Sequence, residues 1–106
     1  MFDDIIYEDK FIWHHLKNEL NKQKHKISFE TAIGVFDDPF AIIGYDLANS
    51  TKQEDRYKTT GIISTRLVFV TVSFTPRGEF IRVLSARKAD KTEKEEYFEN
   101  TRRSLG

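Results

Sequence analysis

Arginine is the residue type whose placement in this sequence most suggests chemistry. Its guanidinium group matches phosphate oxygens in a bidentate manner and stays charged at any cellular pH. Side chains alternate between the two faces of a strand, so in the predicted strand 79–86 one face carries Ile81, Val83 and Ser85 and the other carries Phe80, Arg82, Leu84 and Ala86. Arg82 thus lies between apolar neighbours. Either an ion pair with Glu54 or Glu79, or a function, would hold a cation there. Five arginines fall on predicted strands or their turns: Arg56, Arg66, Arg77, Arg82 and Arg87.

Other catalytic signatures are missing from the sequence. The 5 glycines stand apart, so there is no glycine-rich phosphate loop, and there is neither a cysteine nucleophile nor a serine elbow. The 3 histidines lack the spacing of a metal site, and we expect no metal or other cofactor. A ribonuclease that uses the 2′-hydroxyl of its substrate needs a base, an acid and cations around the phosphate. Metal-independent RNA cleavage therefore remains compatible with this sequence.

The charged residues are unevenly distributed along a chain whose formal net charge is zero. Residues 10–28 carry five bases and one acid (+4), and residues 56–89 carry seven bases and one acid (+6). Between them, residues 29–55 carry six acids and one base (−5). Two basic segments can form one positive surface that attracts phosphate. The alternative is that these charges are scattered and solvated.

The composition is typical of one small globular domain. The chain has 106 residues, of which 39% are hydrophobic and 32% charged, and we expect a single domain with residues 1–10 as an N-terminal arm. The absence of cysteine suits a reducing compartment. The acidic N-terminus is unlike a secretion signal, and no apolar run approaches the roughly 20 residues of a membrane helix. We therefore expect a cytoplasmic protein without a membrane partner.

Two helices are predicted in the N-terminal third. In the first, residues 14–24, the spacing places Trp13, Leu16 and Leu20 on one buried stripe. A neighbouring polar face carries Lys17, Asn21 and either Lys24 or His25. The second helix follows Ser28 as its N-cap and ends before Pro39. Residues 11–13 suit either a short strand or the start of the first helix.

The rest of the chain predicts strands and a final helix. Four strands are expected, at 40–45, 56–63, 67–74 and 79–86, the third of them central or covered on both faces. A tight hairpin over residues 75–78 displays Arg77 at its tip. Asp90 and Glu93 resemble a capping box before a charged helix that continues to residue 103. Segregated helices and strands predict an α+β fold with two N-terminal helices, an antiparallel sheet of about four strands and a C-terminal helix.

Six blocks of sequence, in order, resemble the BrnT family of toxins. They cover residues 11 to about 98, and the most distinctive is Ile81-Arg82-Val83-Leu84-Ser85-Ala86-Arg87. Two positions depart from the family pattern: His14 stands where an aspartate is expected, and Lys26 stands where a glycine is expected to end the helix. The other blocks are Phe11-x-Trp13-x-x-x-Lys17 with Asn21, Lys24-His25-x-Ile27-Ser28-Phe29-Glu30, Val35-Phe36-Asp37-Asp38-Pro39, Glu54-x-Arg56-Tyr57 with Gly61, and Thr75-x-Arg77-Gly78.

The resemblance implies a RelE-like fold and a toxin of a type II toxin-antitoxin system that cleaves RNA and arrests growth. It also implies a BrnA-type ribbon-helix-helix antitoxin as partner, with operator DNA bound indirectly through that antitoxin. His25 is the expected acid or base, because an unperturbed imidazole titrates near neutrality, although a cation at a helix C-terminus is the alternative. The site residues carried over are His25, Arg56, Arg77, Arg82 and Arg87 for catalysis, with Lys17, Lys24, Glu54 and Tyr97 for RNA binding.

Two other functions compete with RNA cleavage. One is an inactive, toxin-like module that acts only in a complex with the antitoxin. The other is nucleic-acid binding without cleavage, which the zero net charge and the lack of an aromatic RNA-recognition signature disfavour.

Overall fold

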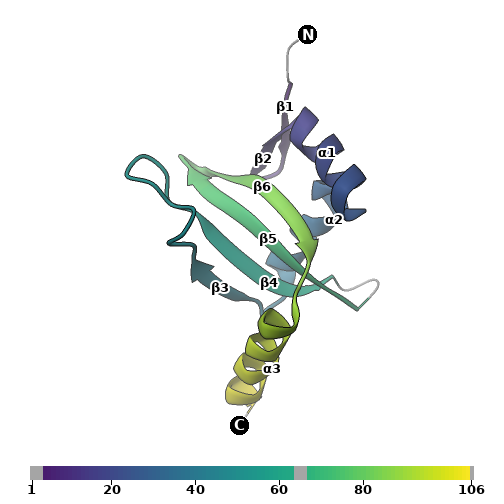
Figure 1. The fold of residues 1–106 in the computed structure, drawn as a ribbon, viewed down its shortest axis with the longest axis vertical. Helices are drawn as coiled ribbons and strands as arrows, with labels where there is room; N and C mark the ends of the chain where they lie inside the picture. Colours follow the sequence, from purple (N-terminus) through teal and green to yellow (C-terminus); the bar gives the residue numbers. More distant parts are fainter. Residues whose placement is uncertain (1–3, 64–66, 106) are drawn as a thin grey trace.

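The computed structural model describes residues 4–63 and 67–105, and its main feature is one sheet. Within these residues six strands pair in the order β1-β2-β6-β5-β4-β3 (Figure 1). Arg66 lies outside the described residues. The strands are β1 (Ile5–Glu8), β2 (Phe11–His14), β3 (Ile42–Tyr45), β4 (Tyr57–Ile63), β5 (Val68–Arg77) and β6 (Phe80–Lys88).

The sheet is larger than predicted and is mixed. The four expected strands are present as β3 to β6 and are antiparallel, with β5 in the middle of the sheet as expected. The N-terminal segment adds two more: β1 pairs antiparallel with β2, and β2 pairs parallel with β6. Residues 5–8 of the expected N-terminal arm thus form an edge strand.

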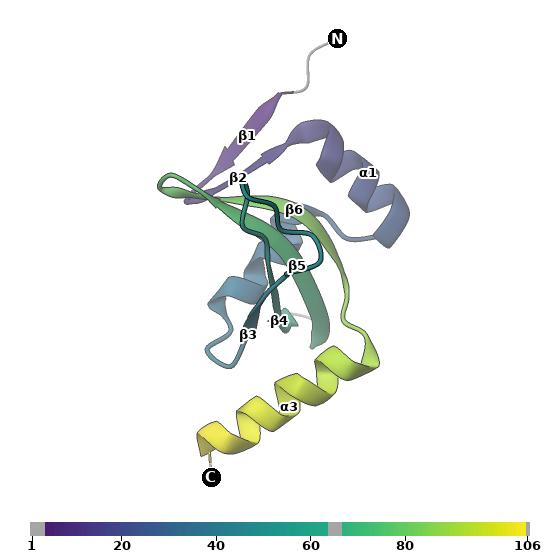
Figure 2. The same cartoon turned by 60° about the vertical axis from the view of Figure 1, so that its left-hand side comes forward.

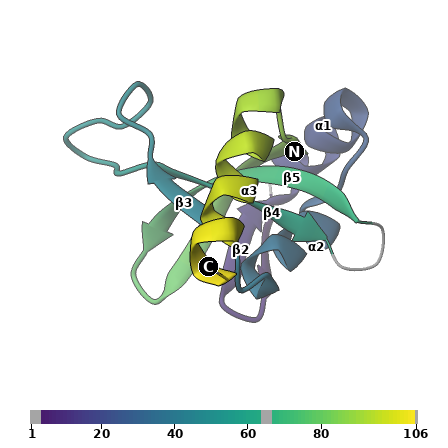
Figure 3. The same cartoon turned by 90° about the horizontal axis from the view of Figure 1, so that it is seen from below.

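The helices of the described residues lie on both faces of the sheet. Three of them cover one face, and the C-terminal helix covers one end of the opposite face. Helix α1 (His15–His25) packs against β6, and η1 (Ile33–Asp37), a 3-10 helix that continues the short helix α2 (Phe29–Ala32), packs against β4 and β5. Helix α3 (Lys91–Leu105) contacts β3 and β4 at the end of the sheet away from α1 (Figures 2 and 3). The second predicted helix is thus one α-helical turn followed by a 3-10 turn.

The hydrophobic core lies between the sheet and the layer formed by α2 and η1. Trp13 packs its ring edge-on against Phe29, with centroids 5.9 Å apart, and both side chains are almost completely buried. Val70 and Val72 from the central strand and Val83 from β6 complete this layer. Burial of these apolar side chains is the main stabilising contribution that fixes β2 and β6 against the helical layer.

Helix α1 buries a different face from the predicted one. Leu16 and Leu20 are 44% and 63% exposed, whereas Asn18 and Asn21 are buried. Asn21 donates to the carbonyl oxygen of Ala86 (2.9 Å) and accepts from the amide nitrogen of the same residue (3.1 Å). The buried side of α1 therefore carries asparagine side chains, and the amide of Asn21 makes the hydrogen bonds to the β6 backbone that a neighbouring strand would otherwise make. The helix ends at Lys26, which is left-handed (φ 60°) in place of the glycine of the family pattern.

A β-bulge in β6 decides which side chains share a face. Ser73 pairs with Ser85, but Phe74 pairs with Val83, so Leu84 is an extra residue. Arg82 pairs with Thr75, and Arg87 pairs with Thr71. Because Thr71 and Thr75 lie four residues apart on one strand, the two arginines share the face opposite the core. The predicted alternation, which put Arg82 and Ala86 on one face, was wrong because of this bulge.

Candidate functional site

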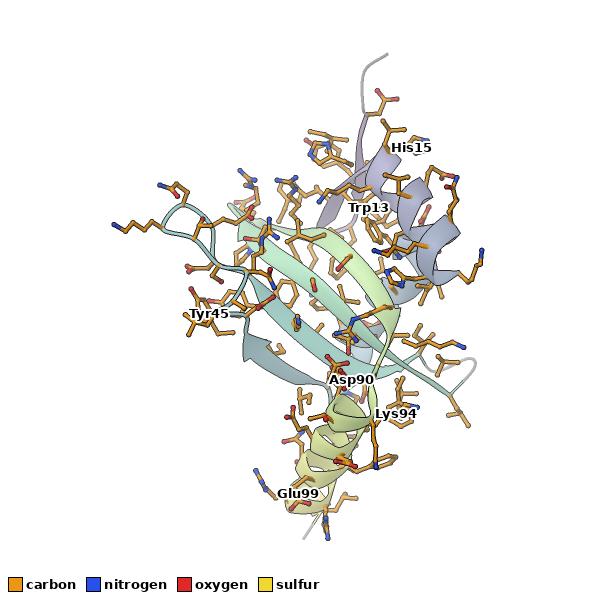
Figure 4. All side chains as sticks on the ribbon, viewed as in Figure 1. Trp13, His15, Tyr45, Asp90, Lys94 and Glu99 are labelled. Carbon is orange, nitrogen blue, oxygen red and sulfur yellow. The ribbon has the colours of Figure 1, made fainter. Side chains whose placement is uncertain are left out.

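The face of the sheet opposite α2 and η1 carries a row of cations, and we call it the open face. Helix α3 covers one end of it, where Phe69 packs against Tyr97 and Phe98, each ring centroid 5.3 Å away. Strand register places Lys58, Arg82 and Arg87 on this face. Figure 4 shows Trp13 and Tyr45 towards opposite edges of the sheet and Asp90 at the start of α3.

Three arginines from separate segments surround Glu54, and we call this group the Glu54 cluster. Arg56, just before β4, places Nε 2.7 Å from one carboxylate oxygen of Glu54. Arg77, at the end of β5, places Nη2 3.7 Å from the other oxygen. Arg82, on β6, is close enough for its charge to lower the pKa of Glu54. Of the five predicted catalytic residues, the structure thus brings three together.

The loop between β3 and β4 holds Glu54 and Arg56 in place. The hydroxyl of Ser50 accepts from the amide nitrogen of Arg56 (2.8 Å), and the hydroxyl of Thr51 accepts from that of Glu54 (3.1 Å). Thr75 on β5 donates to the carbonyl oxygen of Asp55 (2.6 Å) and so ties the loop to the open face. The loop carries its charged side chains as part of a fixed structure.

Electrostatics keep the Glu54 carboxylate ionised. The hydrogen bond from Arg56 lowers the pKa of Glu54, partial burial opposes this shift, and the charges of Arg56, Arg82 and Arg77 add to the lowering. One carboxylate shared among three guanidinium groups leaves an excess of positive charge. The cluster therefore retains the capacity to attract an anion such as a phosphate group.

A hollow of about 260 Å³ opens beside the Glu54 cluster. The Nε atom of Arg82 is buried and has no hydrogen-bond partner among the described residues. His14 lines this hollow, whereas the sequence indicated it only as a departure from the family pattern and as one of three histidines without the spacing of a metal site. His14 is at the end of β2, which pairs with β6. The sequence could have indicated this position only if residues 11–13 had been assigned to a strand, but they suited a helix start equally well. The lining residues are Ile5, Ile12, Trp13, His14, Arg77 and Arg82.

Arg87 and Tyr97 are engaged elsewhere, at the junction with α3. Arg87 places Nη1 2.7 Å and Nη2 3.0 Å from the two carboxylate oxygens of Glu93. Tyr97 is 4% exposed and donates to Asp38 (2.7 Å). Neither residue belongs to the Glu54 cluster, and the burial of Tyr97 argues against its predicted contact with RNA.

The remaining predicted residues lie on α1. His25 lines a separate hollow of about 640 Å³ that also contains Lys22, Lys26 and Lys88, and it is not among the residues of the Glu54 cluster or of the smaller hollow. Lys17 and Lys24 are exposed on the same helix. The predicted basic surface is therefore divided into two basic regions. One contains the arginines of the Glu54 cluster, and the other contains His25 and the lysines around it.

Among the residues that the structure describes, no three His, Cys, Asp or Glu side chains are grouped so that they could hold a metal ion. None of the described helices has both the length and the apolar character needed to cross a membrane.

Comparison with known proteins points to one family. The family model described as ribonuclease toxin, BrnT, of type II toxin-antitoxin systems matches residues 13–93. This range contains α1, the Glu54 cluster and the start of α3, and it omits β1 and all of β2 before Trp13. No curated protein matches the chain.

Proposed function

The chain belongs to the BrnT family of ribonuclease toxins, and from this premise we propose that it cleaves RNA without a metal ion at the Glu54 cluster. The observation that carries the proposal is the convergence of Arg56, Arg77 and Arg82 around a single carboxylate. This excess of guanidinium charge suits a phosphodiester, whose negative charge grows as the 2′-oxygen attacks.

The reaction is an internal transfer. The 2′-oxygen forms a bond to phosphorus, the bond from phosphorus to the 5′-oxygen breaks, and the products are a 2′,3′-cyclic phosphate and a free 5′-hydroxyl. One proton leaves the 2′-hydroxyl and one is delivered to the 5′-oxygen, so the step needs a base and an acid. Arg77 and Arg82 are the groups we assign to the non-bridging oxygens of the phosphate.

His14 is the group we assign to proton transfer, in place of His25. It lines the hollow that Arg77 and Arg82 also line, whereas His25 lines the other basic hollow. An imidazole can donate or accept a proton and is the side chain that most often acts as a general acid or base. Glu54 orients Arg56 and Arg77 and is a positioning residue in this scheme.

Membership of a type II system implies an antitoxin partner. We further propose a ribbon-helix-helix antitoxin of the BrnA type, which contacts operator DNA and brings this chain to it indirectly. The chemistry of the open face supports RNA as the direct ligand, since its exposed cations surround a carboxylate and an apolar hollow.

The test compares cleavage by matched arginine variants. The purified chain is incubated with total RNA and with a synthetic RNA of about 20 nucleotides in the presence of EDTA. Loss of an oxyanion-stabilising donor lowers kcat by about 100- to 1,000-fold, so Arg82→Ala and Arg77→Ala should each do so. Arg103→Ala is the control, because its side chain is 76% exposed on α3. Equal rates for all three variants would contradict the assignment.

A second candidate function is an interaction module that no longer cleaves RNA. Arg56 and Arg87 each make a close ion pair with a carboxylate, as expected for structural cations. RNA that survives high protein concentrations with and without ribosomes, while the antitoxin complex still forms, would favour this function.

A further inference from the structure

The hollow beside the Glu54 cluster combines apolar walls with two guanidinium groups. Ile5 and Ile12 come from β1 and β2, and Arg77 and Arg82 come from the β5–β6 hairpin. Its volume of about 260 Å³ is below the roughly 300–1,000 Å³ of pockets that enclose whole drug-sized ligands. The hollow is therefore suited to a fragment of a larger ligand that lies along the open face.

Strand register places the apolar side chains next to the cations. Ile12 pairs with Arg82 across the β2–β6 ladder, and Tyr7 pairs with Ile12 across the β1–β2 ladder. Paired side chains share a face, so Tyr7, Ile12 and Arg82 form a row across three strands. Tyr7 is 63% exposed and rests edge-on against Phe80, with centroids 5.5 Å apart.

The edge strand β1 carries an apolar side chain, Ile5, that is exposed and does not contribute to the hydrophobic core. Ile5 is 49% exposed, and it lies on the open face, because it pairs with His14, while its neighbour Ile6 packs against the core. Exposed aromatic side chains beside arginines are the combination that binds single-stranded nucleic acid, with phosphates on the cations and bases on the rings. Tyr7 and Arg82 supply this combination on the open face, and Ile5 and Ile12 extend the apolar surface towards the hollow. A ligand that offered phosphate alone would make no use of Ile5 or Ile12.

We propose that this hollow binds one unstacked nucleobase of the RNA substrate, next to the phosphate held by Arg77 and Arg82, and thereby sets a base preference at one position. The inference rests on the proposed function and deepens it. Ile5 and Ile12 precede residue 13, where the family match begins. The base preference is thus a property that the N-terminal strands add to the arginines within the family region.

Binding of non-cleavable oligonucleotides tests the hollow independently of catalysis. The probes are 2′-O-methyl RNAs of about ten nucleotides, either complete or with one abasic position that is moved along the strand. Stacking of a base contributes roughly 5- to 150-fold to affinity. For the intact chain we expect one abasic position to weaken binding within that range, while the others have little effect.

Two isoleucine variants identify the contact. Ile5→Ser removes apolar surface that the base would bury, so it should weaken binding of the complete probe about fivefold or more and leave the affinity of the sensitive abasic probe unchanged. Ile5→Val should retain most of the affinity. Ile43→Ser is the matched control, because Ile43 is 64% exposed on β3, the opposite edge strand. Thermal unfolding shows whether each variant is folded.

The outcomes separate this inference from the proposed function. In one outcome, the chain binds the probes with an affinity that depends on one base position, loses this dependence in Ile5→Ser, and yet cleaves no RNA. That result would support the base site and reject the ribonuclease assignment. Equal loss at every abasic position, equal affinities of the Ile5→Ser and parent proteins, or no binding of the probes would overturn the base site. The same holds if Ile5→Ser leaves RNA affinity intact but prevents neutralisation by the antitoxin, since the hollow would then bind protein.

Discussion

Arg87 and Glu93 form a bidentate ion pair that links strand β6 to helix α3. Both guanidinium nitrogens Nη1 and Nη2 donate to the carboxylate, at 2.7 and 3.0 Å. Glu93 also accepts from the amide nitrogen of Asp90 (2.9 Å), and Asp90 accepts in return from that of Glu93 (2.8 Å), so the predicted capping box is confirmed. Arg87, predicted from the sequence as a catalytic residue, thus orients the start of α3.

This pair predicts a loss of stability at acid pH. Burial would raise the pKa of Glu93, but hydrogen bonds from Arg87, from the Asp90 backbone and from Thr71 outweigh it and lower the pKa to about 2. The folded-state pKa lies below the ordinary value of 4.5, so the stabilisation is present above pH 4.5 and disappears as the pH falls toward 2. Its upper bound is about 3 kcal/mol.

Urea unfolding between pH 7 and pH 3 measures this effect. Glu93→Gln should lower the free energy of unfolding at pH 7 and flatten its decline below pH 5. Glu95→Gln is the control, on the exposed side of the same helix. A parallel pH dependence of Glu93→Gln and parent would mean that the ion pair contributes no such stability.

Part of this fold follows from local sequence rules, because the interactions concerned are short-range. Ser28 caps α2 by accepting from the amide nitrogen of Thr31 (3.1 Å). The predicted hairpin is present as well, although its turn is Gly78 and Glu79, with Gly78 left-handed (φ 60°) and Arg77 still in the strand. Each of these features depends on residues three or four positions apart.

The arrangement of the site depends on contacts that local rules do not contain. Leu16 and Leu20 match a helical apolar stripe, yet Asn21 is buried because its amide pairs with the backbone of β6, 65 residues away. The bulge at Leu84 reverses the alternation that predicted the face of Ala86. For the same reason the sequence predicted the arginines that surround Glu54 but not the strand β1, which extends the sheet at the edge of β2.

Tyr97 should prove to be a structural residue. Burial raises its pKa to about 12, with a further contribution from Asp38, whose carboxylate also accepts from the amide nitrogens of Ile62 (2.8 Å) and Phe40 (2.9 Å). Hydrogen bonds to charged groups contribute about 1.5–3 kcal/mol, so Tyr97→Phe should lower the free energy of unfolding by that amount. RNA affinity should stay unchanged. A folded, fully stable Tyr97→Phe with weakened RNA binding would restore the predicted contact with RNA.

Substitutions of His14 and of His25 should have different effects on RNA cleavage. His14→Asn should lower the rate of RNA cleavage by about 100- to 10,000-fold, the range for loss of a general acid or base. It should also remove one limb of the pH–rate profile. His25→Asn should leave both the rate and the profile unchanged, because His25 lines the other hollow. The opposite result would return the proton-transfer role to His25.

Glu54 is expected to limit RNA affinity while it orders the arginines around it. Its carboxylate lies 2.7 Å from Nε of Arg56 and 3.7 Å from Nη2 of Arg77, and Glu54→Gln keeps the shape of the side chain but removes its charge. The cluster then gains one net positive charge, so RNA should bind more tightly and with a steeper salt dependence. For a single strand the slope of log K against log salt changes by about 0.7 for each additional phosphate neutralised.

Cleavage by the same variant should change in the opposite direction. Without the charged carboxylate, Arg56 and Arg77 lose the partner that fixes their orientation, so kcat should fall even though RNA binds more tightly. Glu99→Gln is the matched control, because Glu99 also contacts two arginines, Arg102 and Arg103, but on the exposed surface of α3. A general base at Glu54 would steepen the salt slope in the same way, because the same charge is lost, but its removal would also abolish one limb of the pH–rate profile. An unchanged shape of the pH–rate profile in Glu54→Gln is therefore expected for a positioning carboxylate, and a lost limb would identify the carboxylate that accepts the proton.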